Sequence, residues 1–260
     1  MLILKLTIVP LALLALGVVE RLHGPRLAGW LAGIPVVAGP LLVFITLDHG
    51  PGFGAHAALG AWFGLVPWLG FANVYAFFAR FAGWLWCLPL ALAVWLGLAV
   101  LSGIAQEGPR WLAVVPLLAY AAAVLLNSRG PASNREREHV WWGLPARMLA
   151  GAALTLAITR FAGALGSHWS GVLTAFPVLG SIIAVSNHVQ YGRHAVQEAV
   201  AGMSMGLSSV GAFCFTVYVL LPHIAMWPAF ILALMASSTV HALTFLLFTK
   251  VRRPARLPQA

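Results

Sequence analysis

The chain consists of long apolar runs separated by short polar stretches. Clusters of Gly, Pro and charged residues interrupt the apolar runs, for example at residues 20–26, 48–54 and 127–147. A helix needs roughly 20 mostly apolar residues to cross a bilayer, and the runs between the clusters have about that length. We therefore expect an all-α bundle of about nine transmembrane spans, at residues 2–19, 27–47, 55–79, 82–103, 110–127, 146–165, 169–187, 195–220 and 226–249.

The composition favours a single membrane domain over residues 1–260. Apolar residues make up 61% of the chain and charged residues only 8%, whereas about 25% of the residues of a soluble domain are charged. The formal charge of +9 is carried by short loops between apolar segments. Membrane topology explains this charge better than nucleic-acid binding does. The lipid bilayer is the expected partner, and no nucleic acid is expected.

The distribution of Lys and Arg predicts the orientation of the chain. If the first span starts outside, twelve of the fifteen Lys and Arg residues fall in cytoplasmic segments, and only Lys5, Arg110 and Arg160 lie elsewhere. Cytoplasmic loops carry an excess of these residues. We therefore predict a multi-pass protein of the inner (plasma) membrane with a basic cytoplasmic tail at 251–260. The first apolar run is read as a retained helix, because no convincing signal-peptide cleavage site follows it.

A shift of 142 positions relates the two halves of the chain. It places Gly29, Pro35, Gly50, Gly60 and Gly64 on Gly171, Pro177, Gly192, Gly202 and Gly206. A chance match between two apolar segments is the alternative. A true repeat would give a first copy at 1–105, a linker helix and cytoplasmic loop at 106–144, and a second copy at 145–250. Four spans per copy and one linker span make the repeat inverted, as in many secondary transporters.

One stretch of the second half resembles a known family. Residues 167–178, Ser-His-Trp-Ser-Gly-Val-Leu-Thr-Ala-Phe-Pro-Val, are followed by apolar residues, a polar turn and a Gly-rich helix. This pattern resembles the small GlpM-type bacterial membrane proteins, each of which is similar to one half of this chain. The resemblance covers mainly residues 145–250, with 29–64 as a looser copy. It implies a membrane fold and a fused duplicate, and it assigns no functional residue.

Two prolines at matching depths are expected to break the second and seventh spans. Pro35 and Pro177 each remove a backbone donor from a helix. Carbonyl groups freed at such a break can bind a solute or an ion, and a simple kink is the alternative. The matched Gly60-x-x-x-Gly64 and Gly202-x-x-x-Gly206 predict close helix packing, with the third and eighth spans crossing.

Four polar side chains complete the predicted substrate site. Glu198 lies about a turn inside the eighth span, and His56 occupies the matching position of the first copy. A carboxylate there could bind a cation or exchange a proton. Asn73 and Asn187 are expected to hydrogen-bond a solute, with a bond to another helix as the alternative. His241 is a further ionisable residue, within the ninth span.

The sequence contains no recognisable catalytic motif. It has no Gly-x-Ser-x-Gly, no His-Glu-x-x-His and no phosphate-binding loop, and its histidine pairs lack the spacing of a metal site. We therefore expect no enzyme activity, no metal and no cofactor. The favoured function is a small-solute transporter or exporter that works by alternating access between inverted repeats. The alternative is a non-transporting membrane scaffold or a lipid-handling protein.

Overall fold

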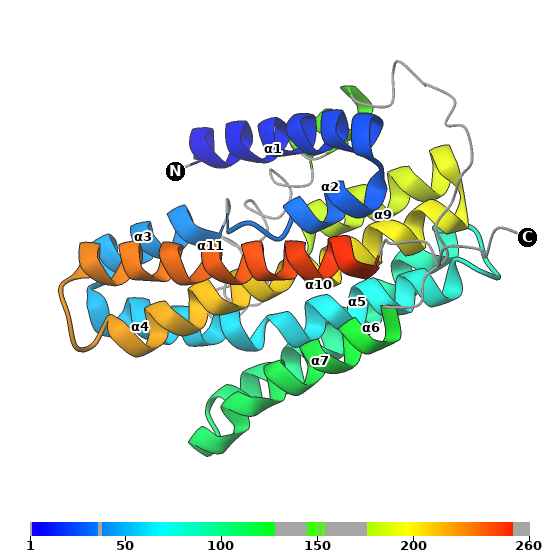
Figure 1. The fold of residues 1–260 in the computed structure, drawn as a ribbon. Coiled ribbons are helices and arrows are strands. Elements are labelled where there is room, and N and C mark those ends of the chain that lie inside the picture. The colour runs from blue at the N-terminus through cyan, green and yellow to red at the C-terminus, as the bar shows by residue number, and fades with distance from the viewer. Residues whose placement is uncertain (1, 36–37, 128–144, 151, 154–175, 252–260) are drawn as a thin grey trace, which may run out of the picture.

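The computed structural model describes residues 2–35, 38–127, 145–150, 152–153 and 176–251, and the regular structure within these ranges is entirely helical. The elements in chain order are α1 (Leu2–His23), α2 (Pro25–Leu31), α3 (Ala38–His49), α4 (Pro51–Phe63), α5 (Leu65–Phe78), α6 (Trp84–Gln106), the 3-10 helix η1 (Arg110–Val114), α7 (Val115–Asn127), α9 (Val178–Tyr191), α10 (Arg193–Leu220) and α11 (Met226–Val251). A further helical stretch covers 145–150. Figure 1 shows that most of the helix axes are roughly aligned.

Four helices among the described residues are long and apolar enough to cross a bilayer. They are Pro51–Phe78, which combines α4 and α5, Trp84–Gln106, Arg193–Leu220 and Met226–Leu246. These helices coincide with the predicted third, fourth, eighth and ninth spans, and they indicate a membrane protein.

The remaining predicted spans are not among these four. The first corresponds to α1, a continuous helix of 22 residues. The second span is divided into α2 and α3, and the fifth span is a 3-10 turn followed by α7, a helix of 13 residues. Most of the predicted sixth span, and the start of the seventh up to residue 175, lie outside the described residues. The count of nine spans therefore stays a prediction.

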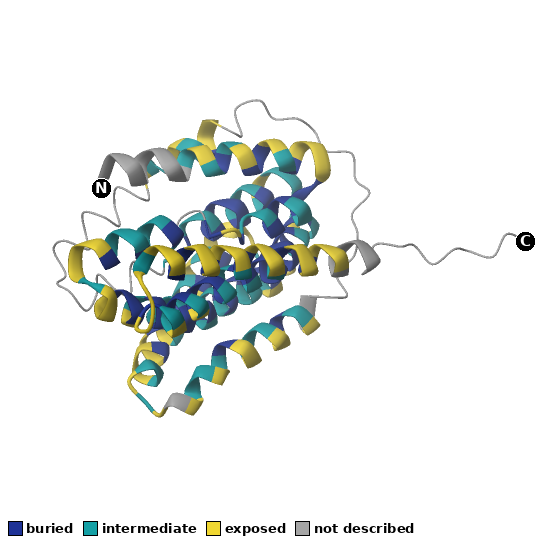
Figure 2. Cartoon of the chain, turned by 60° about the vertical axis from the view of Figure 1, so that its left-hand side comes forward, coloured by how far each residue is buried: buried dark blue, intermediate teal, exposed yellow. Residues whose placement is uncertain are grey.

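The helix α10 forms the centre of the bundle. It packs against α2, α4, α5, α7, α9 and α11. In an apolar stretch of 18 residues of α10, 56% of the residues are buried, compared with 28% in the corresponding stretches of α6 and α11. Figure 2 shows the same contrast, because buried residues gather on the inner helices while the outer helices carry exposed faces. A helix with neighbours on all sides has little surface left for lipid.

Small residues allow α10 to approach α2 at backbone distance. A methyl group at Gly202 would overlap the carbonyl oxygen of Arg26, and one at Gly206 would overlap the carbonyl of Trp30. Conversely, a methyl group at Gly29 in α2, or at Gly33 just after α2, would overlap the backbone of α10. Both helices thus present glycines one turn apart at the contact.

The predicted packing role of Gly202 and Gly206 is confirmed, but their partner is α2. The third span, α4 and α5, also packs against α10, on another face of that helix. Its Gly60 lies beside the side chain of Gln106, since a methyl group there would come 3.1 Å from Gln106 Oε1. Gly60 therefore faces α6, and the matched glycines of the two halves have different neighbours.

Candidate functional site

The second predicted span is broken at the depth where α2 meets α10. The helix α2 ends at Leu31, Pro35 lies buried beyond it, and α3 begins at Ala38. Since Pro35 has no backbone N–H, the helix cannot continue through this position without losing a hydrogen bond. Irregular backbone in a membrane protein is tolerated where protein encloses it. Here α10 provides that enclosure.

A serine of α10 satisfies one of the carbonyl groups near the break. The Ser209 hydroxyl lies 2.6 Å from the carbonyl oxygen of Gly33 and 3.0 Å from that of Gly206. A hydroxyl has one proton, and the shorter distance assigns this proton to Gly33. Ser209 is almost completely buried, so this bond ties the broken helix to α10 inside the bundle.

His241 of α11 joins this cluster through the same hydroxyl. Its Nδ1 atom lies 3.1 Å from Ser209 Oγ. Because the serine proton is used on a carbonyl oxygen, the serine oxygen must accept a hydrogen from Nδ1. Nδ1 therefore carries a hydrogen. In the neutral ring, the lone pair is then on Nε2.

Trp30 of α2 covers the His241 ring. The two ring centroids are 3.7 Å apart and the rings are nearly parallel, at 21°. The Trp30 indole donates a hydrogen bond of 3.1 Å to Thr244 Oγ1, and Thr244 in turn donates to the His241 carbonyl oxygen at 2.9 Å. Two helices that are distant in sequence thus fix the imidazole by stacking and by hydrogen bonds.

The second nitrogen of this histidine is the chemically notable atom. His241 Nε2 is buried and has no hydrogen-bond partner among the described residues. A buried ionisable ring inside a membrane span is costly and is therefore a functional candidate. An unpaired Nε2 can accept a proton or a hydrogen bond from a solute. The sequence signal for it was an ionisable residue in an apolar span, but sequence reasoning gave His241 no role.

The predicted residues of the second copy lie on α9. Pro177 is buried and caps the start of α9, and the residues of the predicted span that precede Phe176 lie outside the described part. Asn187 is completely buried. Its Nδ2 donates 2.9 Å to the Ile183 carbonyl, and its Oδ1 has no partner among the described residues. Within the described structure, the Asn187 amide therefore uses its donor group on its own helix and leaves its oxygen available.

The other predicted residues lie apart from one another. Asn73 Nδ2 donates 2.8 Å to the Leu69 carbonyl of its own helix. Glu198 is half-buried near the start of α10, and His56 is exposed near the start of α4. These two helix starts lie at opposite ends of the bundle, because the start of α4 lies beside the end of α10. The structure therefore does not bring Glu198 and His56 into one site.

A buried ion pair links α1 to the stretch at 145–150. Arg147 Nη1 lies 2.6 Å from Glu20 Oε2, and Nη2 lies 3.1 Å from Glu20 Oε1. The side chains are 7% and 3% exposed. The sequence predicted both residues in polar loops, but Glu20 belongs to α1 and Arg147 to the helical stretch at 145–150. Only the tertiary structure shows that the two charges compensate each other.

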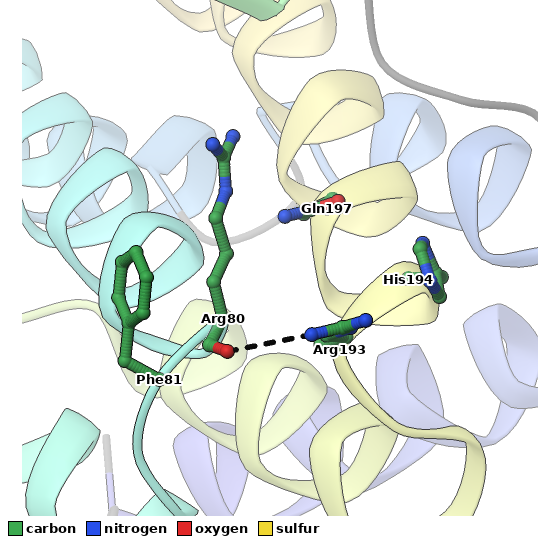
Figure 3. A pocket seen from close by; sticks show the side chains of 5 residues that line it. All are labelled: Arg80, Phe81, Arg193, His194 and Gln197. Atoms are coloured by element: carbon green, nitrogen blue, oxygen red, sulfur yellow. Dashed lines mark hydrogen bonds between the residues drawn. The ribbon is translucent and has the colours of Figure 1, made fainter.

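Two pockets border charged residues of the described part of the chain. The larger one has a volume of about 440 Å³ and is lined by Arg80, Phe81, Arg193, His194 and Gln197 (Figure 3). The smaller one borders the Glu20–Arg147 pair. Neither pocket includes Pro35, Pro177 or Glu198.

The described residues also contain no group of three His, Cys, Asp or Glu that could hold a metal ion. A scan against protein-family models, a search of the curated proteins and a search of the solved structures each found no match to this chain.

Proposed function

We propose that the protein is a small-solute transporter or exporter of the inner membrane that works by alternating access between two inverted repeats. The observation that carries the proposal is the broken helix at Pro35. Its freed backbone lies in the same cluster as His241 Nε2, which has no hydrogen-bond partner among the described residues. Broken helices with polar groups at membrane depth are the usual material of solute and ion sites in secondary transporters.

The helix boundaries support the repeat independently of residue identity. Adding 142 to Pro51, Phe78 and Trp84 gives Arg193, Leu220 and Met226, which are the bounds of α10 and the start of α11. Both spans of the pair have 28 residues. The turns before them are also alike, because Gly50 and Gly192 both adopt positive φ, at 87° and 77°. Such a backbone conformation favours glycine.

The directions of the paired spans support an inverted repeat. Gly54 at the start of α4 lies against Leu221 at the end of α10, and Arg80 after α5 contacts Arg193 at the start of α10. The two 28-residue spans are therefore antiparallel, as Figure 1 shows. This arrangement is expected of repeats related by an axis in the membrane plane.

In this proposal α2 and α3 move separately about the break at Pro35. The glycine contacts hold α2 on α10, while α3 packs on α4 of the first repeat. A change in this connection would expose the cluster around His241 to one side of the membrane at a time. The imidazole Nε2 would then exchange a proton or bind the solute. The cluster has few charges, so the solute is apolar, amphipathic or weakly charged.

The alternative is a non-transporting scaffold or a lipid-handling protein. It is favoured by the positions of the two pockets, which lie beside residues at helix ends and not beside the broken helix. A lipid-handling protein needs headgroup contacts at the membrane surface rather than a central path.

Distance measurements between spin labels test alternating access without a known solute. One pair, Phe53→Cys with Ile224→Cys, reports on one end of the bundle, and Phe81→Cys with Val189→Cys reports on the other. All four positions are exposed. The native Cys87 and Cys214 are buried and would be replaced by Ala.

Alternating access predicts two distance populations for each pair. A change of pH or an added solute that lengthens one mean distance should shorten the other. Single narrow distributions at both ends under all conditions would count against the proposal. Uptake of a panel of amphipathic solutes into proteoliposomes, with His241→Gln as the matched variant, would then identify the cargo.

A further inference from the structure

The larger pocket lies where membrane-crossing helices reach the water. Arg80 falls between the spans Pro51–Phe78 and Trp84–Gln106, and Arg193 is the first residue of Arg193–Leu220. Arg193 Nη1 lies 3.5 Å from the Arg80 carbonyl oxygen, so the two arginines share one end of the bundle. Figure 3 shows the Arg80 and Gln197 side chains beside each other, with Phe81 on the side of Arg80 away from Gln197. The Arg80 guanidinium extends away from the carbonyl oxygen that Arg193 contacts.

The described residues that line this pocket carry positive but no negative charge. None of the described lining residues is acidic, and neither guanidinium forms an ion pair with a described carboxylate. The Arg80 guanidinium carbon instead lies 5.7 Å from the Phe77 ring centroid. Both arginines are exposed. Two guanidinium groups that border one pocket, with no described carboxylate among its lining residues, attract an anion.

The turn geometry does not require these arginines. The repeat offset of 142 relates Arg193 to Pro51 and Arg80 to Pro222, at the opposite end of the bundle. The glycine turn before Pro51 has the same positive φ as the one before Arg193. An equivalent turn thus forms with proline in place of arginine. The two arginines therefore add positive charge at one membrane face, and the fold itself does not need this charge.

The surroundings of the pocket match the boundary between headgroups and acyl chains. Phe81 is 76% exposed and Trp86 is 77% exposed, and Trp84 and Leu85 are also exposed beside them. Exposed aromatic side chains are typical of the headgroup region. A molecule held by the arginines would therefore have its apolar part against this surface. Free phosphate would use the cations but not the aromatic side chains.

We propose that Arg80, Arg193 and Gln197 form a binding site for the phosphate group of an anionic phospholipid, whose acyl chains lie against Phe81 and Trp86. Basic pockets between membrane helices bind such headgroups in other proteins. The volume of about 440 Å³ is sufficient for a glycerophosphate headgroup. This proposal rests on the membrane placement of the four long helices and not on transport, so it can hold even if the transport proposal fails.

Native mass spectrometry of the full chain, released from detergent micelles with added lipid, tests the site. The probes are phosphatidylglycerol, which is anionic, and phosphatidylcholine, which is neutral overall. We expect phosphatidylglycerol to bind in preference, and each of Arg80→Gln and Arg193→Gln to weaken its binding about tenfold, the loss of roughly one charge-assisted hydrogen bond. Arg80→Lys should retain part of the affinity, because it keeps the charge but loses the planar donor pair.

Arg110→Gln is the matched control, since Arg110 follows the far end of α6 and the substitution removes the same charge. It should leave binding unchanged. The proposal is overturned if both lipids bind equally, or if Arg110→Gln weakens binding as much as the pocket variants do. It is also overturned if soluble glycerol phosphate or inorganic phosphate displaces the lipid at equal concentration, because the site would then recognise a free anion. The thermal unfolding temperature of each variant is also measured in detergent. If it is unchanged, a loss of lipid binding is not caused by a loss of folding.

Discussion

Gly33 and Gly206 touch through their backbones, with no side chain between them. A methyl group built on Gly33 would overlap the main chain of Gly206, and one built on Gly206 would overlap the Trp30 carbonyl oxygen and come 3.1 Å from Gly33 Cα. In lipid, helices associate by van der Waals packing rather than by hydrophobic exclusion, so backbone contact contributes directly to stability. The same contact places the Gly33 carbonyl within reach of Ser209, one turn of α10 further on. Packing and the polar cluster therefore depend on each other.

Gly206→Ala should therefore destabilise the protein by about 1–3 kcal/mol, because the two helices must separate to accept the methyl group. Gly103→Ala on α6 is the control, since a methyl group there meets nothing within 4 Å. It should be neutral or slightly stabilising, as expected from helix propensity. Unfolding in mixed detergent micelles measures both variants. Equal stability of the two would show that α2 does not lie on α10 as described.

The Glu20–Arg147 pair should behave as one unit. Glu20→Gln or Arg147→Met alone leaves a buried charge without its partner, and each should cost about 3–5 kcal/mol. The double variant Glu20→Leu with Arg147→Met should recover most of that loss, since it removes both charges. Arg21→Gln, an exposed neighbour at the same pocket, should stay within about 0.5 kcal/mol of the parent. Additive losses in the double variant would contradict the pairing.

The turns at Gly50 and Gly192 provide a test of the duplication. Both glycines have positive φ, and a methyl group at either position meets nothing within 4 Å. Both have ψ near 180°, a combination that is essentially restricted to glycine, so Gly50→Ala and Gly192→Ala should each cost about 1–3 kcal/mol through backbone strain alone. Thermal unfolding in detergent measures the loss of stability in each variant. Costs that differ by more than about 2 kcal/mol would mean that the two turns do not play equivalent roles.

The sequence predicts the spans that have a simple pattern. The third, fourth, eighth and ninth spans are long apolar runs between polar turns, and the structure places long helices there. The break near Pro35 follows from the missing N–H of proline. The prediction is less successful for the fifth span, because Pro109 and Pro116 shorten the regular helix there.

The sequence could not identify the partners of these elements. Small residues one turn apart predict close packing, but they do not say that Gly202 and Gly206 pack on α2. Glu20 and Arg147 are 127 positions apart, and each looked like an ordinary loop charge. Ser209 and His241 meet only because α10 and α11 fold back on each other around a broken helix. Such pairings depend on the tertiary structure, and local sequence patterns do not contain this information.

The polar cluster supports two predictions of opposite sign. Ser209→Ala leaves the buried Gly33 carbonyl and the His241 Nδ1 hydrogen without this partner, so it should destabilise the protein by about 1–3 kcal/mol. His241→Phe keeps a ring that stacks on Trp30 and removes Nε2, which has no partner among the described residues. It should be neutral or stabilising by up to about 1 kcal/mol, because an unsatisfied buried polar atom is lost.

A histidine that costs stability where phenylalanine fits indicates a functional demand on the imidazole. In proteoliposomes, His241→Phe should abolish solute flux that depends on a pH gradient, although the variant folds at least as well as the parent. His241→Gln, which keeps a polar group near Ser209 but cannot exchange a proton in the same way, should also lose the pH dependence. If both variants transport normally, Nε2 is not the working group, and Glu198 becomes the next residue to test by Glu198→Gln. If instead His241→Phe unfolds the protein, the cluster serves packing, and the histidine is retained for structure.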